Sequence, residues 1–349
     1  MKTKLLFNFF LLTNMFLIAQ NVNIPDANFK SYLLGNSSIN TNGDTEIQIS
    51  EATSFSGSFN AIGLGITDLT GIEAFTSLGA FSAASNALTS VDLSQNTSLV
   101  EVRLPDNQLT SIDVSNLPNL IFLQLSNNPI TSLDLTNNPN LETIICNNAQ
   151  LSSISLNNPI LTQLELGGNQ LTSVDTSSLP QLFEVFLQNN QLTNIDLSAN
   201  SNLFTIRLDS NNLSSCNVAN GNNANISLAN FFFNPNLACI QVDNGFTPFV
   251  SSSGAWLADA TASFNSNCNL SIDQFNKIEA KIFPNPVLDI LNIDSNYAPN
   301  SIEIYSVLGK EMISVKNTQT VDVAKLKSGA YFIKVSSDNG SFTKRFIKH

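Results

Sequence analysis

The chain has 349 residues, of which 42% are hydrophobic and only 12% are charged, so it can build a core in more than one domain. The charge is uneven: residues 21–276 carry three cations against 20 carboxylates, whereas residues 277–349 carry ten cations against seven. Because so acidic a body repels phosphate, the composition argues against nucleic-acid binding and against docking on anionic lipid. The acidity favours calcium or a cationic partner, or serves solubility alone.

Residues 1–20 have the pattern of a secretory signal peptide. Lys2 and Lys4 precede an apolar run over 5–18, which ends at Ala19-Gln20, a small residue at the expected cleavage point. This run is too short for a comfortable membrane span, and no other stretch approaches 18 apolar residues. We therefore expect an exported protein, soluble or surface-attached, with no transmembrane segment after signal removal. Its cysteines are free to oxidise.

Residues 21–54 are predicted to cap the repeats that follow, because IPDANFKSYLLG suggests a short amphipathic helix. The next stretch, NTNGDTEIQISE (40–51), half-matches an EF-hand-type calcium loop. Its first ligand is Asn instead of Asp, and Thr45 holds the turn position. Ca²⁺ is the one cofactor that the sequence suggests, and the alternative is a polar turn that joins the helix to the first coil. The candidate ligands are Asn40, Asn42, Asp44, Glu46 and Glu51.

Residues 55–242 repeat a pattern of 20 or 21 residues, of which LIFLQLSNNPITSLDLTNNPN (120–140) is one unit. The L-x-x-L-x-L stretch alternates like a strand, and so does the later xLTSxDL stretch. Because no unit can bury its apolar face alone, we expect seven stacked units to share one core. The units begin at Leu78, Leu99, Leu120, Leu141, Leu161, Leu182 and Leu203.

One column of the repeat is asparagine, with Ala149 as its exception. A buried amide at this position can satisfy backbone groups that a tight turn leaves unpaired, and stacked copies can also bond to one another. The column consists of Asn86, Asn107, Asn128, Asn169, Asn190 and Asn211.

The repeat pattern resembles the leucine-rich-repeat family over residues 55–242, and GITDLTGIEAFTSL (65–78) resembles the internalin-type version. This resemblance implies a solenoid of short, mostly β repeats.

Residues 243–275 are predicted to form a C-terminal cap with a linker. Phe231–Phe233 are expected to plug the end of the core, and LACIQV (237–242) to form the last strand. Cys146 and Cys216 occupy inward columns and are predicted to be buried free thiols. Cys239 is outward on the last strand and Cys268 follows 29 residues later, so we predict a disulfide between them that closes the cap.

Residues 276–349 lack the repeat and contain short alternating strands between turns, which predicts a small antiparallel β-sandwich. The tail reads IFPNPVLDILNI (282–293), SIEIYSVLGKEM (301–312) and VDVAKLKSGAYFIKV (321–335) and has a basic end over 344–348. Together these motifs resemble the type A C-terminal sorting domain of the type IX secretion system. The resemblance implies export across a Bacteroidetes-type outer membrane by that machinery, then cleavage and either release or attachment to lipopolysaccharide. The alternative is an immunoglobulin-like domain that stays attached. The motif residues include Pro284, Asn285, Pro286, Gly309, Gly329 and Tyr331.

Catalytic motifs are missing from the sequence. The only histidine is His349, which excludes histidine triads and HExxH zinc sites, and there is no CxxC and no phosphate-binding glycine loop. Paired carboxylates can hydrolyse glycosides, but the aspartates at 92, 113, 134, 175 and 196 form one exposed column that the repeat explains. We therefore expect no enzyme activity.

Strand parity predicts a ligand-binding concave face. The third and fifth positions of L-x-x-L-x-L point away from the core, and several hold apolar residues where polar ones are expected. Two arginines lie in the same columns, and apolar anchors near arginine are typical of binding hot spots. The alternative is scattered surface residues. The candidate residues are Arg103, Phe122, Ile145, Phe186 and Arg207.

The sequence therefore predicts a leucine-rich-repeat solenoid with a small C-terminal β-sandwich. It indicates a secreted or cell-surface module of scaffold or adaptor type that binds an extracellular protein. The alternative is a glycan-binding surface adhesin, which the content of one Trp and four Tyr disfavours.

Overall fold

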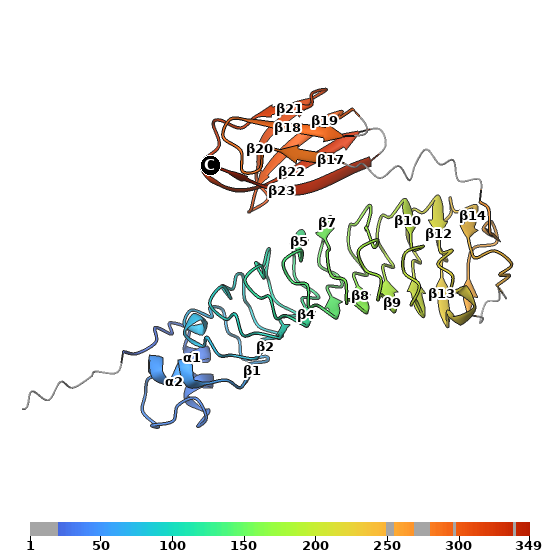
Figure 1. The fold of residues 1–349 in the computed structure, drawn as a ribbon. Helices are drawn as coiled ribbons and strands as arrows, with labels where there is room; N and C mark the ends of the chain where they lie inside the picture. Colours follow the sequence, from blue (N-terminus) through green and yellow to red (C-terminus); the bar gives the residue numbers. More distant parts are fainter. Residues whose placement is uncertain (1–19, 249–254, 269–279, 296–297, 338–339) are drawn as a thin grey trace, which may run out of the picture.

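The computed structural model describes residues 20–248, 255–268, 280–295, 298–337 and 340–349. The predicted signal peptide, apart from Gln20, lies outside the described residues. The described residues from 20 to 268 form a solenoid, and those from 280 to 349 form a separate β-module (Figure 1).

The N-terminal end of the solenoid is covered by two short helices, α1 (Ala27–Leu34) and α2 (Ile49–Ser54). Helix α1 begins after Asp26 because that carboxylate accepts hydrogen bonds from the backbone N–H groups of Asn28 and Phe29. The helix buries Phe29 and Leu33 against the first coil. Phe59 of β1 (Ser58–Asn60) lies at the centre of an aromatic cluster with Phe29, Tyr32, Phe55, Phe75 and Phe81.

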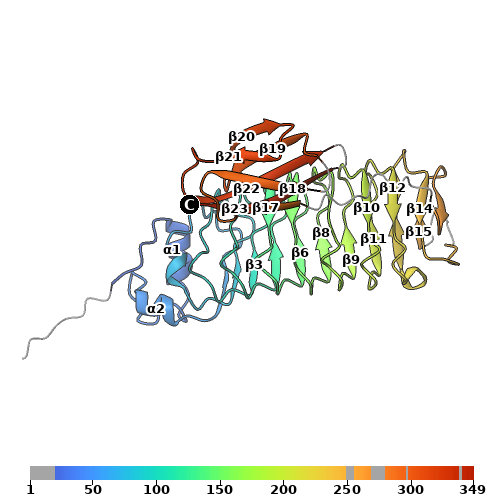
Figure 2. The same ribbon diagram turned by 45° about the horizontal axis from the view of Figure 1, so that its top comes forward.

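One side of the solenoid is a ten-stranded parallel sheet in the order β1-β2-β3-β4-β6-β8-β9-β11-β13-β15. Figure 2 shows its strands side by side along the solenoid. The middle residue of most strands is buried and the flanking residues are half-buried, as the alternation predicts. After β1, the strands are β2 (Ala80–Ser82), β3 (Glu101–Arg103), β4 (Phe122–Gln124), β6 (Thr143–Ile145), β8 (Gln163–Glu165), β9 (Glu184–Phe186), β11 (Thr205–Arg207), β13 (Leu228–Asn230) and β15 (Trp256–Leu257).

The other side is less regular. Strands β5 (Ser132–Asp134) and β7 (Ser153–Ser155) pair with each other. A four-stranded parallel sheet follows, made of β10 (Asn194–Asp196), β12 (Ser215–Asn217), β14 (Cys239–Gln241) and β16 (Ser263–Asn265). Two 3-10 turns, η1 (Ile72–Ala74) and η2 (Asn223–Asn225), complete the solenoid.

The asparagine column binds the backbones of two successive coils. Nδ2 of Asn107 donates to the carbonyl oxygens of Ala83, 2.9 Å away in the preceding coil, and of Leu104, 3.2 Å away in its own coil. Its Oδ1 accepts from the N–H of Leu88 at 3.1 Å. The pattern repeats up to Asn211 and continues at Asn234. Among the described residues these amides bond to backbone groups and not to one another, so the expected contact between stacked copies was wrong.

A second, fully buried set of asparagines lies on the other side of the core. Asn96 donates to the carbonyl oxygens of Ile72 and Phe75 in the preceding coil, at 2.8 and 3.0 Å. Asn138, Asn158 and Asn200 make similar bonds to carbonyl oxygens of preceding coils. These side chains therefore connect successive coils on the side where fewer coils form a strand.

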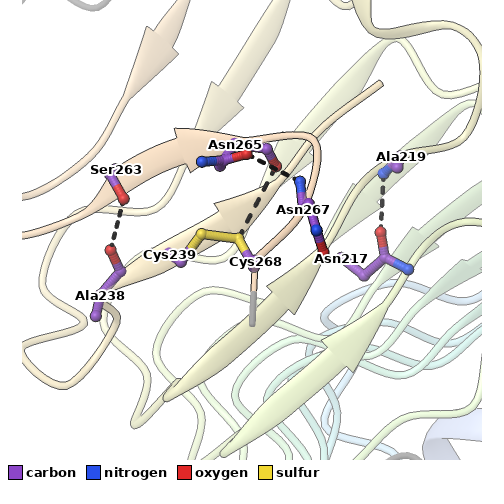
Figure 3. Close-up of a disulfide and its surroundings, with 8 residues drawn as sticks. All are labelled: Asn217, Ala219, Ala238, Cys239, Ser263, Asn265, Asn267 and Cys268. Atoms are coloured by element: carbon purple, nitrogen blue, oxygen red, sulfur yellow. Dashed lines mark hydrogen bonds between the residues drawn. A yellow bond between two sulfur atoms is a disulfide. The ribbon is translucent and has the colours of Figure 1, made fainter. Parts of the chain in front are cut away.

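The stacked coils continue past residue 242, within the segment expected to form the cap. Strand β15 pairs with β13, and β16 pairs with β14. Phe231 is fully buried and packs against Trp256, whereas Phe233 is 70% exposed, so the prediction that Phe233 plugs the end was wrong. A disulfide joins Cys239 of β14 to Cys268, which follows β16, with Cα atoms 5.8 Å apart (Figure 3). The predicted disulfide is confirmed.

The C-terminal module consists of two antiparallel sheets, as predicted. One has the order β17-β18-β21, and the other β20-β19-β22-β23. Their inner faces share a core that includes Leu291, Ile304, Ile333 and Phe346. The strands are β17 (Ala280–Phe283), β18 (Ile290–Ser295), β19 (Ser301–Ser306), β20 (Glu311–Lys316), β21 (Thr320–Asp322), β22 (Gly329–Ser337) and β23 (Gly340–Lys348).

Candidate functional site

The outward columns of the ten-stranded sheet form a surface that we call the sheet face. Figure 1 shows the sheet along the concave side of the solenoid. Because the strands pair in register, residues of one column lie next to each other on successive strands. The first column holds Glu101, Phe122, Thr143, Gln163, Glu184 and Thr205, and the second holds Arg103, Gln124, Ile145, Glu165, Phe186 and Arg207.

Arg103 and Phe122 are in direct contact on the sheet face. The guanidinium carbon of Arg103 lies 4.0 Å from the centre of the Phe122 ring, and Nε of Arg103 also pairs with the carboxylate of Glu101. A cation over an aromatic face contributes about 0.5–1 kcal/mol at an exposed site. The ring and the guanidinium are thus held in place before any partner binds.

The rest of the predicted site is not one continuous patch. Ile145 and Phe186 are separated in their column by Glu165, on the strand between them. Glu165 accepts hydrogen bonds from Gln163 at 2.6 Å and from Asn147 at 3.0 Å. Arg207 lies beside Phe186 and pairs with Asp209, Nε to Oδ1 3.1 Å. The sheet face therefore alternates apolar side chains with charged ones that already have partners.

Sequence reasoning missed an apolar column at the edge of this face. The residue that precedes each strand is apolar and exposed in four coils: Val100, Ile121, Phe183 and Phe204. The rings of Phe183 and Phe204 stack with centroids 5.0 Å apart and planes 4° apart. An open pocket beside them is lined by Thr162, Gln163, Gln181, Phe183, Glu184, Ser201, Asn202 and Asn222. The signal in the sequence was an apolar residue directly after the first Leu of a unit, where polar residues are expected.

The predicted calcium loop forms a hydrogen-bonded turn. Oε1 of Glu51 accepts from the N–H of Thr41 at 2.8 Å, from its hydroxyl at 2.9 Å and from the N–H of Asn42 at 3.2 Å, and Oε2 accepts from the N–H of Gln48 at 3.0 Å. Burial alone raises the pKa of Glu51, but these hydrogen bonds more than offset it, so the pKa is lowered. Both oxygens of the expected bidentate ligand thus have protein donors.

The remaining candidate ligands are also engaged. Glu46 pairs with Lys30 at 2.7 Å, Asp44 accepts from the N–H of Glu46 and from Asn42, and Asn40 is bonded to Gly43 and Asp44. No group of three or more His, Cys, Asp or Glu side chains in the described part of the chain is placed to hold a metal ion. These contacts favour the polar turn over a calcium site, and calcium binding stays a prediction.

The thiols and the aspartate column have structural roles. Cys146 and Cys216 are buried and unpaired, as predicted. Burial raises the pKa of Cys146 to about 12 and also raises that of Cys216, so neither is a thiolate at neutral pH. Asp92, Asp113 and Asp196 each accept a bond from the backbone N–H two residues later and so stabilise turns.

The sorting-motif residues shape one end of the C-terminal module. Asn285 accepts a bond at 2.8 Å from the N–H of Ile347 in β23, and cis peptide bonds precede Pro284 and Pro286. Tyr331 donates to the carbonyl oxygen of Lys327 at 3.0 Å and stacks on Phe346. Gly309 has a φ of 73° in the β19–β20 turn, a conformation that favours glycine. In the described ranges, no helix is both long and apolar enough to span a bilayer.

Comparison with known proteins gives one family match, in the C-terminal module. Residues 281–349 match the secretion system C-terminal sorting domain. No curated protein matches the chain. Among solved structures, internalin C2 from Listeria monocytogenes is 19% identical, with a TM-score of 0.49 over 64% of this chain and 98% of that one.

Two further solved structures have lower TM-scores. The functional domain of InlJ from Listeria monocytogenes is 18% identical over 95% of this chain and 98% of that one, with a TM-score of 0.31. A leucine-rich-repeat protein from Leptospira interrogans is 21% identical over 48% and 52%, with a TM-score of 0.40. The repeats, their stacked coils and the matched tail together identify the chain as a leucine-rich-repeat solenoid that ends in a type IX secretion C-terminal sorting domain, and thus as a secreted or surface-attached protein.

Proposed function

We propose that the solenoid is a non-catalytic recognition module of scaffold or adaptor type, which binds another extracellular protein through the sheet face. The sorting domain supports export, and the absence of histidine other than His349 supports a non-catalytic role. The proposed binding residues are Arg103, Phe122, Ile145, Phe186 and Arg207.

The contact between Arg103 and Phe122 carries this proposal. The guanidinium lies 4.0 Å from the ring centre, and the side chains of both residues are half-buried, so an amphipathic pair is already formed. Prearranged aromatic and arginine side chains bind with little loss of conformational entropy, which is why they are enriched at the centres of interfaces. Phe186 and Ile145 add apolar area on nearby strands, and the carboxylates between them favour a partner with basic groups.

The partner can be captured by placing a photo-crosslinking amino acid at Gln124, which lies between Arg103 and Ile145 in the second column. Affinity for the purified partner is then measured for the double variant Phe122→Ala with Phe186→Ala. Its matched control is Phe233→Ala, which removes a phenyl ring that is 70% exposed and lies outside the strands of the sheet.

We expect the double variant to bind at least about tenfold more weakly, since anchors of this kind contribute roughly 2 kcal/mol or more together. The control variant is expected to bind like the unsubstituted protein. Equal affinity of the double variant and the unsubstituted protein would contradict the proposal.

A further inference from the structure

Phe183 and Phe204 form an exposed aromatic slab at the edge of the sheet face. They precede β9 and β11, and their side chains are 44% and 40% exposed. The rings are nearly parallel, 4° apart, with centroids separated by 5.0 Å. That separation is close to the spacing of about 4.8 Å between neighbouring strands, so each ring extends straight out from its own coil.

The outer face of Phe183 is left accessible by its neighbour in the column. Backbone hydrogen bonds of 2.8 Å connect Thr162 to Phe183 and Phe183 to Phe204, so the three side chains follow one another on successive coils. Phe204 covers one face of the Phe183 ring. Thr162 is shorter than a phenyl ring and leaves the other face less covered. Thr162 and Phe183 both line the pocket described above, which extends along the later coils to Ser201, Asn202 and Asn222.

The polar wall of this pocket consists of neutral amides, the hydroxyl groups of Thr162 and Ser201, and one carboxylate. It includes Gln163, Gln181, Asn202, Asn222 and Glu184, and no cationic side chain lines it. Nδ2 of Asn202 donates to Oε1 of Gln181 at 3.0 Å, and this bond holds both amide groups in place. The bond does not use Oδ1 of Asn202 or Nε2 of Gln181. Amides both donate and accept hydrogen bonds, whereas the carboxylate only accepts them.

We propose that this pocket binds a neutral saccharide. One face of a sugar ring is rich in C–H groups and stacks on the electron-rich face of an aromatic ring, while its hydroxyl groups both donate and accept hydrogen bonds. Phe183 supplies the stacking surface, the amides bind hydroxyl groups, and Glu184 accepts from one of them. With no cation in the wall and a strongly acidic solenoid around it, the pocket excludes phosphorylated, sulfated and other anionic ligands.

This site borders the protein-binding surface proposed above and shares Gln163 and Glu184 of the sheet face with it, but it uses none of the five residues named there. The two proposals can therefore fail independently. Phe183→Ala is expected to leave binding to the crosslinked protein partner unchanged, and Phe122→Ala with Phe186→Ala is expected to leave saccharide binding unchanged.

Affinity electrophoresis of the purified exported protein in gels that contain a neutral glucan, mannan, xylan or galactan tests the proposal. Phe183→Ala removes the stacking surface. Thr162→Phe keeps both rings but covers the open face of Phe183 with a third ring, as Phe204 already covers the other. Ile121→Ala is the matched control, because Ile121 is 40% exposed in the same column and lies outside the pocket.

We expect at least one neutral polysaccharide to retard the protein. Phe183→Ala and Thr162→Phe are expected to weaken that binding by about tenfold or more, and Ile121→Ala to leave it unchanged. Circular dichroism of each variant checks that it is folded. The proposal is overturned if no neutral polysaccharide retards the protein, if Phe183→Ala binds as well as the unsubstituted protein, or if a sulfated polysaccharide binds and the neutral ones do not.

Discussion

Substituting alanine for Asn128 and for Asn190 removes the same side chain from the same column, yet the two changes are expected to differ in cost. Both residues are buried, and each binds two carbonyl oxygens and one N–H at distances of 3.1 Å or less. The difference lies in which backbone groups keep a second partner.

At Asn190 both carbonyl oxygens have another amide donor. The carbonyl of Leu166 also accepts from Asn169, and that of Leu187 also accepts from Asn211, so only the N–H of Leu171 loses its partner. At Asn128 the carbonyl of Leu104 keeps Asn107, but the next coil has Ala149 in the column. Among the described residues, the carbonyl of Leu125 and the N–H of Leu109 therefore lose their side-chain partner together.

An unpaired buried polar group costs about 1–3 kcal/mol. Asn190→Ala is thus expected to lower the free energy of unfolding by about 1–3 kcal/mol, and Asn128→Ala by about 2–6 kcal/mol. Urea unfolding followed by circular dichroism measures both values, with the exposed Asn140→Ala as the control. Equal losses of unfolding free energy for Asn128→Ala and Asn190→Ala would refute the idea that the asparagine column stabilises the solenoid through shared backbone acceptors.

Four further predictions follow from the caps and the tail. Burial alone raises the pKa of Asp26, but hydrogen bonds from Thr67, Phe29 and Asp68 more than offset it and lower the pKa, as at Glu51. A carboxylate whose pKa is lowered by folding stabilises the protein at pH values above its pKa in the unfolded chain. This contribution is lost as the pH falls through its pKa in the folded protein, so the free energy of unfolding should decline below about pH 4. Asp26→Asn should flatten that decline, and an unchanged pH profile would contradict this. Replacing Cys239 and Cys268 with Ser opens a loop with a sequence separation of 29 and should lower the free energy of unfolding by about 3.5 kcal/mol. Limited proteolysis should then cleave β14–β16 earlier than in the unsubstituted protein, and equal protease resistance would contradict this prediction. Calorimetric titration with millimolar calcium should give no binding heat if residues 40–51 are the polar turn that their hydrogen bonds favour, and saturable heat lost in Glu51→Gln would restore the calcium site. Intact mass of the protein from its host should correspond to a product that begins near residue 20 and ends near residue 275, and retention of residues 282–349 would make the tail a working domain.

The sequence predicted the solenoid because its signal recurs in every coil. The inward columns, the asparagine column and the outward direction of Arg103 and Phe122 all follow from one 21-residue period, and the disulfide follows from the parity of Cys239. The second set of buried asparagines was missed because Leu117 and Leu179 interrupt that column, so no single residue type marks it. The coil of β15 and β16 was missed because it lacks the L-x-x-L-x-L pattern.

The candidate site was only partly accessible to sequence reasoning. Parity showed which side chains leave the core, and the repeat already placed Glu165 between Ile145 and Phe186 in their column. It did not show that Glu165 accepts hydrogen bonds from Gln163 and Asn147. The Phe183–Phe204 stack depends on two neighbouring coils both having an aromatic residue one position before the strand. This stack would have been found by comparing polar and apolar residues at every position of the repeat, and not only at the strand positions.

The asparagine column, which forms a ladder along the solenoid, also gives the solenoid a direction of assembly. Each asparagine completes the hydrogen bonds of the coil before it, so a coil that has just formed still lacks partners until its successor arrives. A chain that folds from its N-terminus would therefore complete the hydrogen bonds of each coil only when the next coil has formed. The last ladder residue, Asn234, is completed differently, because its N–H and that of Phe233 donate to the carboxylate of Asp259 at 2.8 and 3.2 Å. Asp259 thus supplies the acceptor for these two backbone N–H groups, and it belongs to the coil that the Cys239–Cys268 disulfide links to β14.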